Sequence, residues 1–252
     1  MQTLLGKVAL VTGGGSGIGR ATALAFARSG AKVVVAGRRI TEGEETIRLI
    51  LEQAGEAIFV QTDVTKSKSI EDLMLAVLEA YGHLDYAFNS AGTEGGLGPI
   101  TELSEEEWDK TINTNLKGTW LAMRAEIPLM MRNGGGSIVN ISSFAGVVGM
   151  PGATIYAASE NGIIGLTRAA AIEYARSGIR INSVTPGPVD TAMMDRFVGG
   201  SPEAKAQLAA STALGRAGQP EEIASAVLWL AADTASFVTG HNLVVDGGYT
   251  VQ

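Results

Sequence analysis

The chain has 252 residues, of which 46% are hydrophobic and 18% charged, and its formal net charge is −7. These values are typical of an ordered globular protein and argue against a nucleic-acid surface, which needs clustered Lys and Arg. The absence of cysteine excludes disulfides, thiolate metal sites and a cysteine nucleophile. With no signal-peptide pattern and no apolar run of about 18 residues, we expect a cytoplasmic protein without membrane contact.

Short runs rich in β-branched residues alternate with amphipathic helical patterns along the chain. We expect strands at Val8–Thr12, Lys32–Ala36, Ala57–Thr62, Tyr86–Asn89, Gly136–Ile141, Arg180–Thr185 and Asn242–Asp246. We expect helices at Gly17–Ser29, Ile40–Glu52, Ser67–Tyr81, Ser104–Met131, Ile155–Ala175, Pro202–Ala210 and Pro220–Ala232. Continuous apolar runs such as VALV are typical of strands that helices bury on both faces. The pattern predicts a single α/β domain over residues 1–252, with a Rossmann-type, doubly wound parallel sheet of about seven strands.

The first predicted strand ends in VTGGGSGIG and leads directly into a helix. Glycines at 13, 17 and 19 let the backbone turn tightly and approach a ligand closely. The N-terminus of the following helix offers free N–H groups and the positive end of its dipole, which suit a pyrophosphate. The segment therefore predicts a dinucleotide-binding loop, although a tight turn without a ligand would leave a similar pattern.

The second predicted strand ends in VVVAGRR, where Rossmann folds usually meet the adenosine ribose. A carboxylate at this place binds the 2′-hydroxyl of NAD, whereas Arg accommodates the 2′-phosphate of NADP. Arg38 and Arg39 follow Gly37 here, and Arg can hold a phosphate through two hydrogen bonds. The sequence thus favours NADP(H) over NAD(H), and a pair of solvated surface arginines is the alternative.

Over essentially its whole length, the sequence resembles the short-chain dehydrogenase/reductase family, in its single-domain branch of about 250 residues. The family's cofactor loop matches the stretch that includes Gly13, Ser16, Gly17, Ile18 and Gly19. The later cofactor motifs match, in order, Asp63 and Val64, Asn89, Ala91 and Gly92, Pro186 and Gly187, Val189, and Thr191. The resemblance implies hydride transfer between a nicotinamide cofactor and a small-molecule carbonyl or alcohol.

The same resemblance implies catalytic roles for Asn115, Ser143 and Tyr156, with Ser142 as an alternative to Ser143. In the family, Tyr is the general acid or base, contacts the cofactor, and is followed one helical turn later by a Lys that lowers its pKa. Here that position is Glu160, in the sequence YAASEN. A carboxylate opposes ionisation of a neighbouring phenol, whose ordinary pKa is about 10.

Three interpretations of Glu160 follow. In the first, the chain is an active reductase that tolerates this residue because burial keeps the carboxyl group partly protonated. In the second, it is a cofactor-binding pseudoenzyme or scaffold. In the third, it is a point-substituted form of an ordinary enzyme. Because Asn115, Ser143, Tyr156 and the cofactor motifs are all present, we favour an enzyme, with activity reduced by Glu160. A solvated helix residue without a role is the remaining alternative.

The family places a substrate lid at about residues 192–213 and commonly forms homotetramers. Met193, Met194 and Phe197 would line an apolar pocket or simply pack. The tetramer contacts would involve the last strand and the helices around residues 104–131 and 155–175. The two histidines are far apart in sequence and have no accompanying carboxylate cluster, so we expect no metal site. The identity of the substrate stays open.

Overall fold

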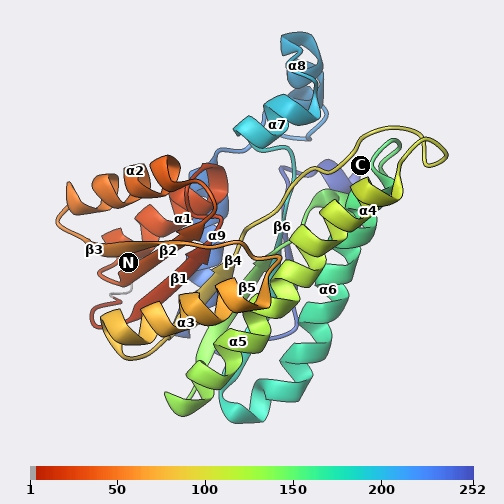
Figure 1. The fold of residues 1–252 in the computed structure, drawn as a ribbon. Coiled ribbons are helices and arrows are strands. Elements are labelled where there is room, and N and C mark those ends of the chain that lie inside the picture. Colours follow the sequence, from red (N-terminus) through yellow and green to blue (C-terminus); the bar gives the residue numbers. More distant parts are fainter. Residues whose placement is uncertain (1–3) are drawn as a thin grey trace.

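Seven parallel strands form the centre of the molecule in a computed structural model that describes residues 4–252 (Figure 1). In chain order they are β1 (Val8–Thr12), β2 (Lys32–Gly37), β3 (Glu56–Gln61), β4 (Tyr86–Asn89), β5 (Gly136–Ile141), β6 (Ile179–Pro186) and β7 (Asn242–Val245). They lie in the order β3-β2-β1-β4-β5-β6-β7. The order changes direction between β1 and β4, and the carboxyl ends of such strands form the crevice where doubly wound sheets bind ligands.

Helices cover both faces of the sheet, as predicted. One face carries α1 (Gly17–Arg28), α2 (Ile40–Leu51) and α9 (Pro220–Ala231), and the other carries α3 (Ser67–Tyr81), α5 (Gly118–Arg132) and α6 (Thr154–Tyr174). Alternate residues of a strand point to opposite faces. In β1, Ala9 and Val11 pack with Phe26 of α1, whereas Val8 and Leu10 pack with Leu73 of α3. This two-sided burial explains why β1 is a continuous apolar run.

The predicted strands agree with the structure to within one residue at each end. The expected uninterrupted α-helix at Ser104–Met131 is wrong in its middle. The structure has α4 (Glu105–Ile112), then a π-helical turn at Asn113–Lys117, then α5. Such turns insert an extra residue into a helix and are frequent at functional sites. This turn contains Asn115.

The segment after β6 contains two short helices, α7 (Ala192–Phe197) and α8 (Pro202–Ala210). The sequence predicted α8 but no helix at α7, which Thr191 caps by accepting a hydrogen bond from the Met194 N–H at 3.3 Å. Figure 1 shows both helices projecting beyond the rest of the fold. Within residues 4–252, the helices are all too short or too polar to span a membrane.

Candidate active site

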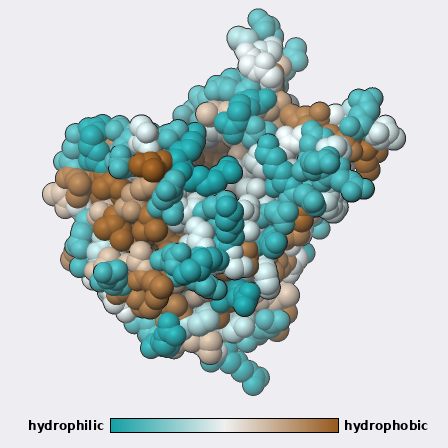
Figure 2. Space-filling view, viewed as in Figure 1, coloured by the Kyte–Doolittle hydropathy of each residue, from teal (hydrophilic) through white to brown (hydrophobic). Residues whose placement is uncertain are grey.

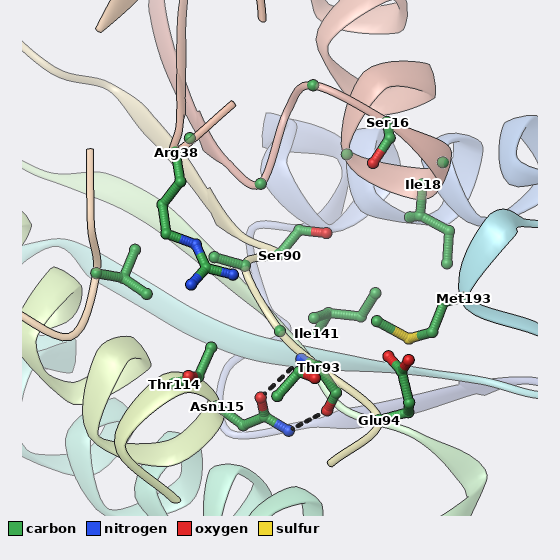
Figure 3. A pocket seen from close by; sticks show the side chains of 18 of the residues that line it. Ser16, Ile18, Arg38, Ser90, Thr93, Glu94, Thr114, Asn115, Ile141 and Met193 are labelled. Atoms are coloured by element: carbon green, nitrogen blue, oxygen red, sulfur yellow. Dashed lines mark hydrogen bonds between the residues drawn. The ribbon is translucent and has the colours of Figure 1, made fainter. Parts of the chain in front are cut away.

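A cavity of about 600 Å³ lies at the carboxyl ends of the strands. Figure 2 shows a recess beneath the projecting α7–α8 segment, bordered by hydrophilic side chains. The glycine-rich loop and Arg38 line one part of the cavity, and Asn115, Tyr156 and Glu160 line another. In Figure 3, Arg38 and Ser16 lie in the upper part of the view, and Glu94 and Asn115 lie in the lower part. The cavity therefore has room for an extended ligand.

The glycine-rich loop packs too closely to carry side chains. A Cβ on Gly13 would lie 2.7 Å from the Ser90 carbonyl oxygen, and one on Gly19 would lie 2.3 Å from the Gly13 carbonyl oxygen. Gly13 and Gly17 also have φ angles of +68° and +51°, which glycine adopts readily. The glycines thus bring the backbone up to the edge of the cavity.

The N-terminus of α1 is suited to an anion. Ser16 is the N-cap residue, but its side chain makes no capping hydrogen bond, and the first turn contains no acidic residue. The first N–H groups of a helix lack intrahelical partners and lie at the positive end of its dipole. The glycine-rich loop and the N-terminus of α1 together form a site that suits the pyrophosphate of a dinucleotide.

The two arginines after β2 have different surroundings. Arg39 donates from Nη2 to Ser16 Oγ at 2.9 Å and pairs through Nη1 with Glu42 Oε1 at 3.1 Å. Both arginines line the cavity, and the Arg38 side chain extends into it (Figure 3). A Cβ on Gly37 would meet nothing within 4 Å, so the space beside Arg38 is open. Arg38 is therefore the better placed of the two to contact a nucleotide.

Most of the other predicted cofactor residues line the same cavity. These are Ser16, Ile18, Asp63, Val64, Ala91, Gly92 and Thr191. Four predicted cofactor residues do not line it, namely Asn89, Pro186, Gly187 and Val189, and neither does Ser143, which was predicted as catalytic. The Asn89 side chain is buried and donates to Glu126 Oε2 at 3.1 Å and to Asn140 Oδ1 at 3.0 Å. It joins β4 to β5 and α5 beneath the cavity floor.

Tyr156 lies on α6 and lines the cavity. Burial and the charge of Glu160 raise the pKa of the Tyr156 phenol well above its usual range, and the hydrogen bond with Ser143 only partly opposes them. Ser142 has another partner, since its Oγ donates to the backbone carbonyl of Glu160 at 3.0 Å. Ser142 lines the cavity and Ser143 does not, but of the two serines it is Ser143 that acts on the pKa of the phenol.

Glu160 is buried, with an exposed fraction of 4%. Burial raises the pKa of its carboxyl group to about 8, although hydrogen bonds with Ser159 and Asn115 act in the opposite direction. Burial therefore favours the neutral form of Glu160 near pH 7. Glu160 is not a solvated helix residue.

Asn115 lies in the π-helical turn and contacts Glu160. Asn115 Nδ2 lies 3.1 Å from both Glu160 Oε1 and Ser159 Oγ and 2.9 Å from the Thr93 carbonyl oxygen. Asn115 Oδ1 in turn accepts from the Thr93 N–H at 2.9 Å (Figure 3). Asn115 therefore joins the loop after β4 to the helix that carries Tyr156 and Glu160.

The charged and polar residues of the cavity wall that sequence reasoning missed include Glu42, Ser90, Lys110 and Thr114. Three more belong to segments that the sequence already placed near the pocket, Thr93 and Glu94 in the loop after β4 and Arg196 in the lid, but were not singled out. Of the three predicted lid residues, Met193 lines the cavity, Met194 is buried, and Phe197 is not part of the cavity wall. Residues 4–252 contain no group of three or more His, Asp or Glu side chains that could hold a metal ion.

The fold and the site define a class of protein: a dinucleotide-binding α/β enzyme with a Ser–Tyr pair near its cofactor cavity. A family model described as "Enoyl-(Acyl carrier protein) reductase" matches residues 13–250. A short chain dehydrogenase/reductase of Aspergillus oryzae is 44% identical, over 99% of this chain and 97% of the relative. Cyclohexanol dehydrogenase of Acinetobacter sp. is 40% identical, over 97% and 95%. The crystal structure of levodione reductase superposes with a TM-score of 0.96 at 34% identity, covering 98% of both chains.

The chain belongs to the short-chain dehydrogenase/reductase family. It is an NAD(P)-dependent oxidoreductase of alcohols or ketones.

Proposed function

We propose that this enzyme interconverts a cyclic ketone with a six-membered ring and the corresponding secondary alcohol, with NADP(H) as cofactor and Tyr156 as proton donor. The observation that carries the proposal is the position of Tyr156 on the wall of the same cavity that the glycine-rich loop lines. The relative named for cyclohexanol supports the ring size. When bound, the nicotinamide cofactor supplies or accepts the hydride.

The protein's own part is to bind the carbonyl oxygen and to move a proton. In this proposal Ser143 and Tyr156 both donate hydrogen bonds to that oxygen, and the phenol gives up its proton as negative charge develops there. Because the pKa of Tyr156 is raised, the phenol is protonated at neutral pH and ready to act as an acid. The reverse reaction needs the phenolate as base, so the raised pKa of Tyr156 slows alcohol oxidation near pH 7.

Glu160 reduces the activity in this proposal. A cation at its position would stabilise the phenolate, whereas a carboxyl group does not. A cofactor-binding pseudoenzyme of the same fold is the second candidate, and the raised pKa values of Tyr156 and Glu160 favour it. Against it, Asn115, Ser143 and Tyr156 remain assembled around the site.

Incubation with cyclohexanone and NADPH, followed by chromatographic detection of cyclohexanol, tests the proposal. We expect cyclohexanol from the unmodified chain and none from Tyr156→Phe, which removes only the phenolic hydroxyl. Unchanged NADPH binding by Tyr156→Phe is the control for folding. Product from Tyr156→Phe at the original rate would contradict the role of Tyr156, and NADPH binding without product from any cyclic ketone would favour the pseudoenzyme.

We further propose that NADP(H) is preferred over NAD(H), because Arg38 extends into the cavity beside the open space at Gly37. Arg holds a phosphate through paired, charge-assisted hydrogen bonds. No carboxylate occupies the two positions after Gly37, where one would favour a free ribose hydroxyl.

A homotetramer is the proposed assembly. Large apolar side chains are exposed on the segments that the family uses for subunit contacts, namely Trp108, Trp120, Ile172 and Val244. Exposed apolar side chains of this size mark interaction surfaces when they gather. Sedimentation equilibrium should give about 104 kDa, four times the chain mass of 26.1 kDa, and a monomer mass would contradict the assembly.

A further inference from the structure

An ion pair joins Glu94 to Arg196 at the substrate end of the cavity. Arg196 Nε and Nη2 donate to the two carboxylate oxygens of Glu94 at 2.6 and 3.0 Å. Glu94 belongs to the loop after β4, and Arg196 belongs to α7, 102 residues later. Both side chains line the cavity. The two-point geometry holds the Glu94 carboxylate in one orientation.

The Glu94 carboxylate is ionised. Burial raises its pKa, but the hydrogen bonds from Arg196 and the charges of Arg196 and Lys110 hold it below the usual 4.5. Its side chain keeps 15% of its surface exposed, and Figure 3 shows its oxygens directed toward Met193 of the lid. The charge of Glu94 also raises the pKa of Tyr156, so this carboxylate lies within electrostatic range of the proton donor.

Glu94 keeps hydrogen-bonding capacity for a ligand. An ionised carboxylate has about four acceptor positions, and Arg196 uses one on each oxygen. Glu160 differs, because burial raises its pKa to about 8 and leaves it largely neutral at pH 7. A substrate that approaches Tyr156 therefore meets Glu94 as its ionised acceptor.

The surrounding charges indicate which donor fits. Arg196 neutralises Glu94, and Lys110 adds a second cation to the cavity wall, so a substrate ammonium group would gain little. A substrate carboxylate would face Glu94 itself, and the guanidinium of Arg196 is already paired. A neutral hydroxyl group can donate to Glu94 without disturbing the pair.

We propose that Glu94 is a specificity-determining residue that accepts a hydrogen bond from a second hydroxyl group of the substrate. The preferred substrates are then ring diols and hydroxyketones, with one oxygen at Tyr156 and the other at Glu94. Arg196 is a positioning residue that acts through Glu94. The proposal rests on the proposed function for its ring substrate.

Calorimetric titration of the NADPH-saturated protein with cyclohexanol and with cyclohexane-1,4-diol tests the proposal without turnover, because the reduced cofactor cannot accept a hydride from an alcohol. A hydrogen bond to a charged group should make the diol bind about tenfold more tightly. In Glu94→Gln the preference should fall below about threefold. The matched control Glu102→Gln removes the same charge from an exposed residue outside the cavity wall and should keep the preference.

Two further measurements separate specificity from folding. Arg196→Ala should weaken binding of the diol severalfold more than binding of cyclohexanol, a split that general loosening of the lid would not produce. Glu94→Gln should retain the thermal midpoint and the NADPH affinity of the unmodified chain.

The role of Glu94 would be overturned if the unmodified chain bound the two alcohols equally well, or if Glu94→Gln kept the full preference for the diol. Either result would leave the proposal of a ring substrate standing. Binding of neither alcohol would instead contradict the ring substrate, and the role of Glu94 with it.

Discussion

Replacing Glu160 with Lys should lower the pKa of Tyr156. One opposite charge within about 6 Å lowers a pKa by roughly 1–3 units, and a like charge raises it by a similar amount. Below pH 8, where Glu160 is mostly neutral, only the added cation counts. Above pH 8 the loss of the negative charge and the gain of the positive charge both count, and the pKa of Tyr156 should differ between the two proteins by about 2–6 units, or roughly 3–8 kcal/mol.

Ultraviolet difference absorbance of tyrosinate measures this shift, with Tyr156→Phe in each background as the subtraction control. The midpoint should fall in the order unmodified chain, Glu160→Gln, Glu160→Lys, because the Gln variant removes a charge without adding one. The rate of alcohol oxidation at pH 9 should rise about tenfold for each unit by which the pKa falls. Circular dichroism confirms that each variant is folded. Identical midpoints in the three folded proteins would refute the electrostatic reasoning.

The structure also predicts effects away from Glu160. Arg38→Ala should weaken NADPH binding by about 10–100-fold, since a charged hydrogen bond contributes roughly 1.5–3 kcal/mol, and should leave NADH binding nearly unchanged. Fluorescence titration measures both affinities. Equal losses for the two cofactors would count against a contact between Arg38 and the 2′-phosphate. Burial raises the pKa of Glu126 from 4.5 to about 7. The unfolded chain therefore releases this proton first, and the folded state loses about 3 kcal/mol as the pH rises from 4.5 to 7. Denaturant unfolding measures the free energy of unfolding at pH 5 and at pH 8. The loss of stability between these two pH values should be smaller in Glu126→Gln than in the unmodified chain. An identical loss in both proteins would contradict a protonated Glu126.

Local patterns were sufficient to predict the sheet and the glycine-rich loop. Strands such as β1 are continuous apolar runs because helices bury both of their faces, and a property of that kind is visible in the sequence. Spacing also predicted the neighbourhood of Tyr156 and Glu160, because residues four apart share a helix face.

Features that depend on long-range contacts were not predictable. The π-helical turn at Asn113–Lys117 sits in a sequence that reads as ordinary helix, and only its tertiary contacts with Thr93 and Glu160 distinguish it. The Glu94–Arg196 pair joins residues 102 positions apart. Asn89 remains a predicted cofactor residue, but its place in the buried network with Glu126 could not be foreseen from its motif.

The most direct test of the central claim compares NADPH oxidation by cyclohexanone in the unmodified chain and in Glu160→Lys, at pH 7 and saturating cofactor. We predict measurable turnover by the unmodified chain, faster turnover by Glu160→Lys, and none when Tyr156→Phe is added to either. The account would be contradicted if the unmodified chain and Glu160→Lys both bound NADPH but neither consumed it with any ketone.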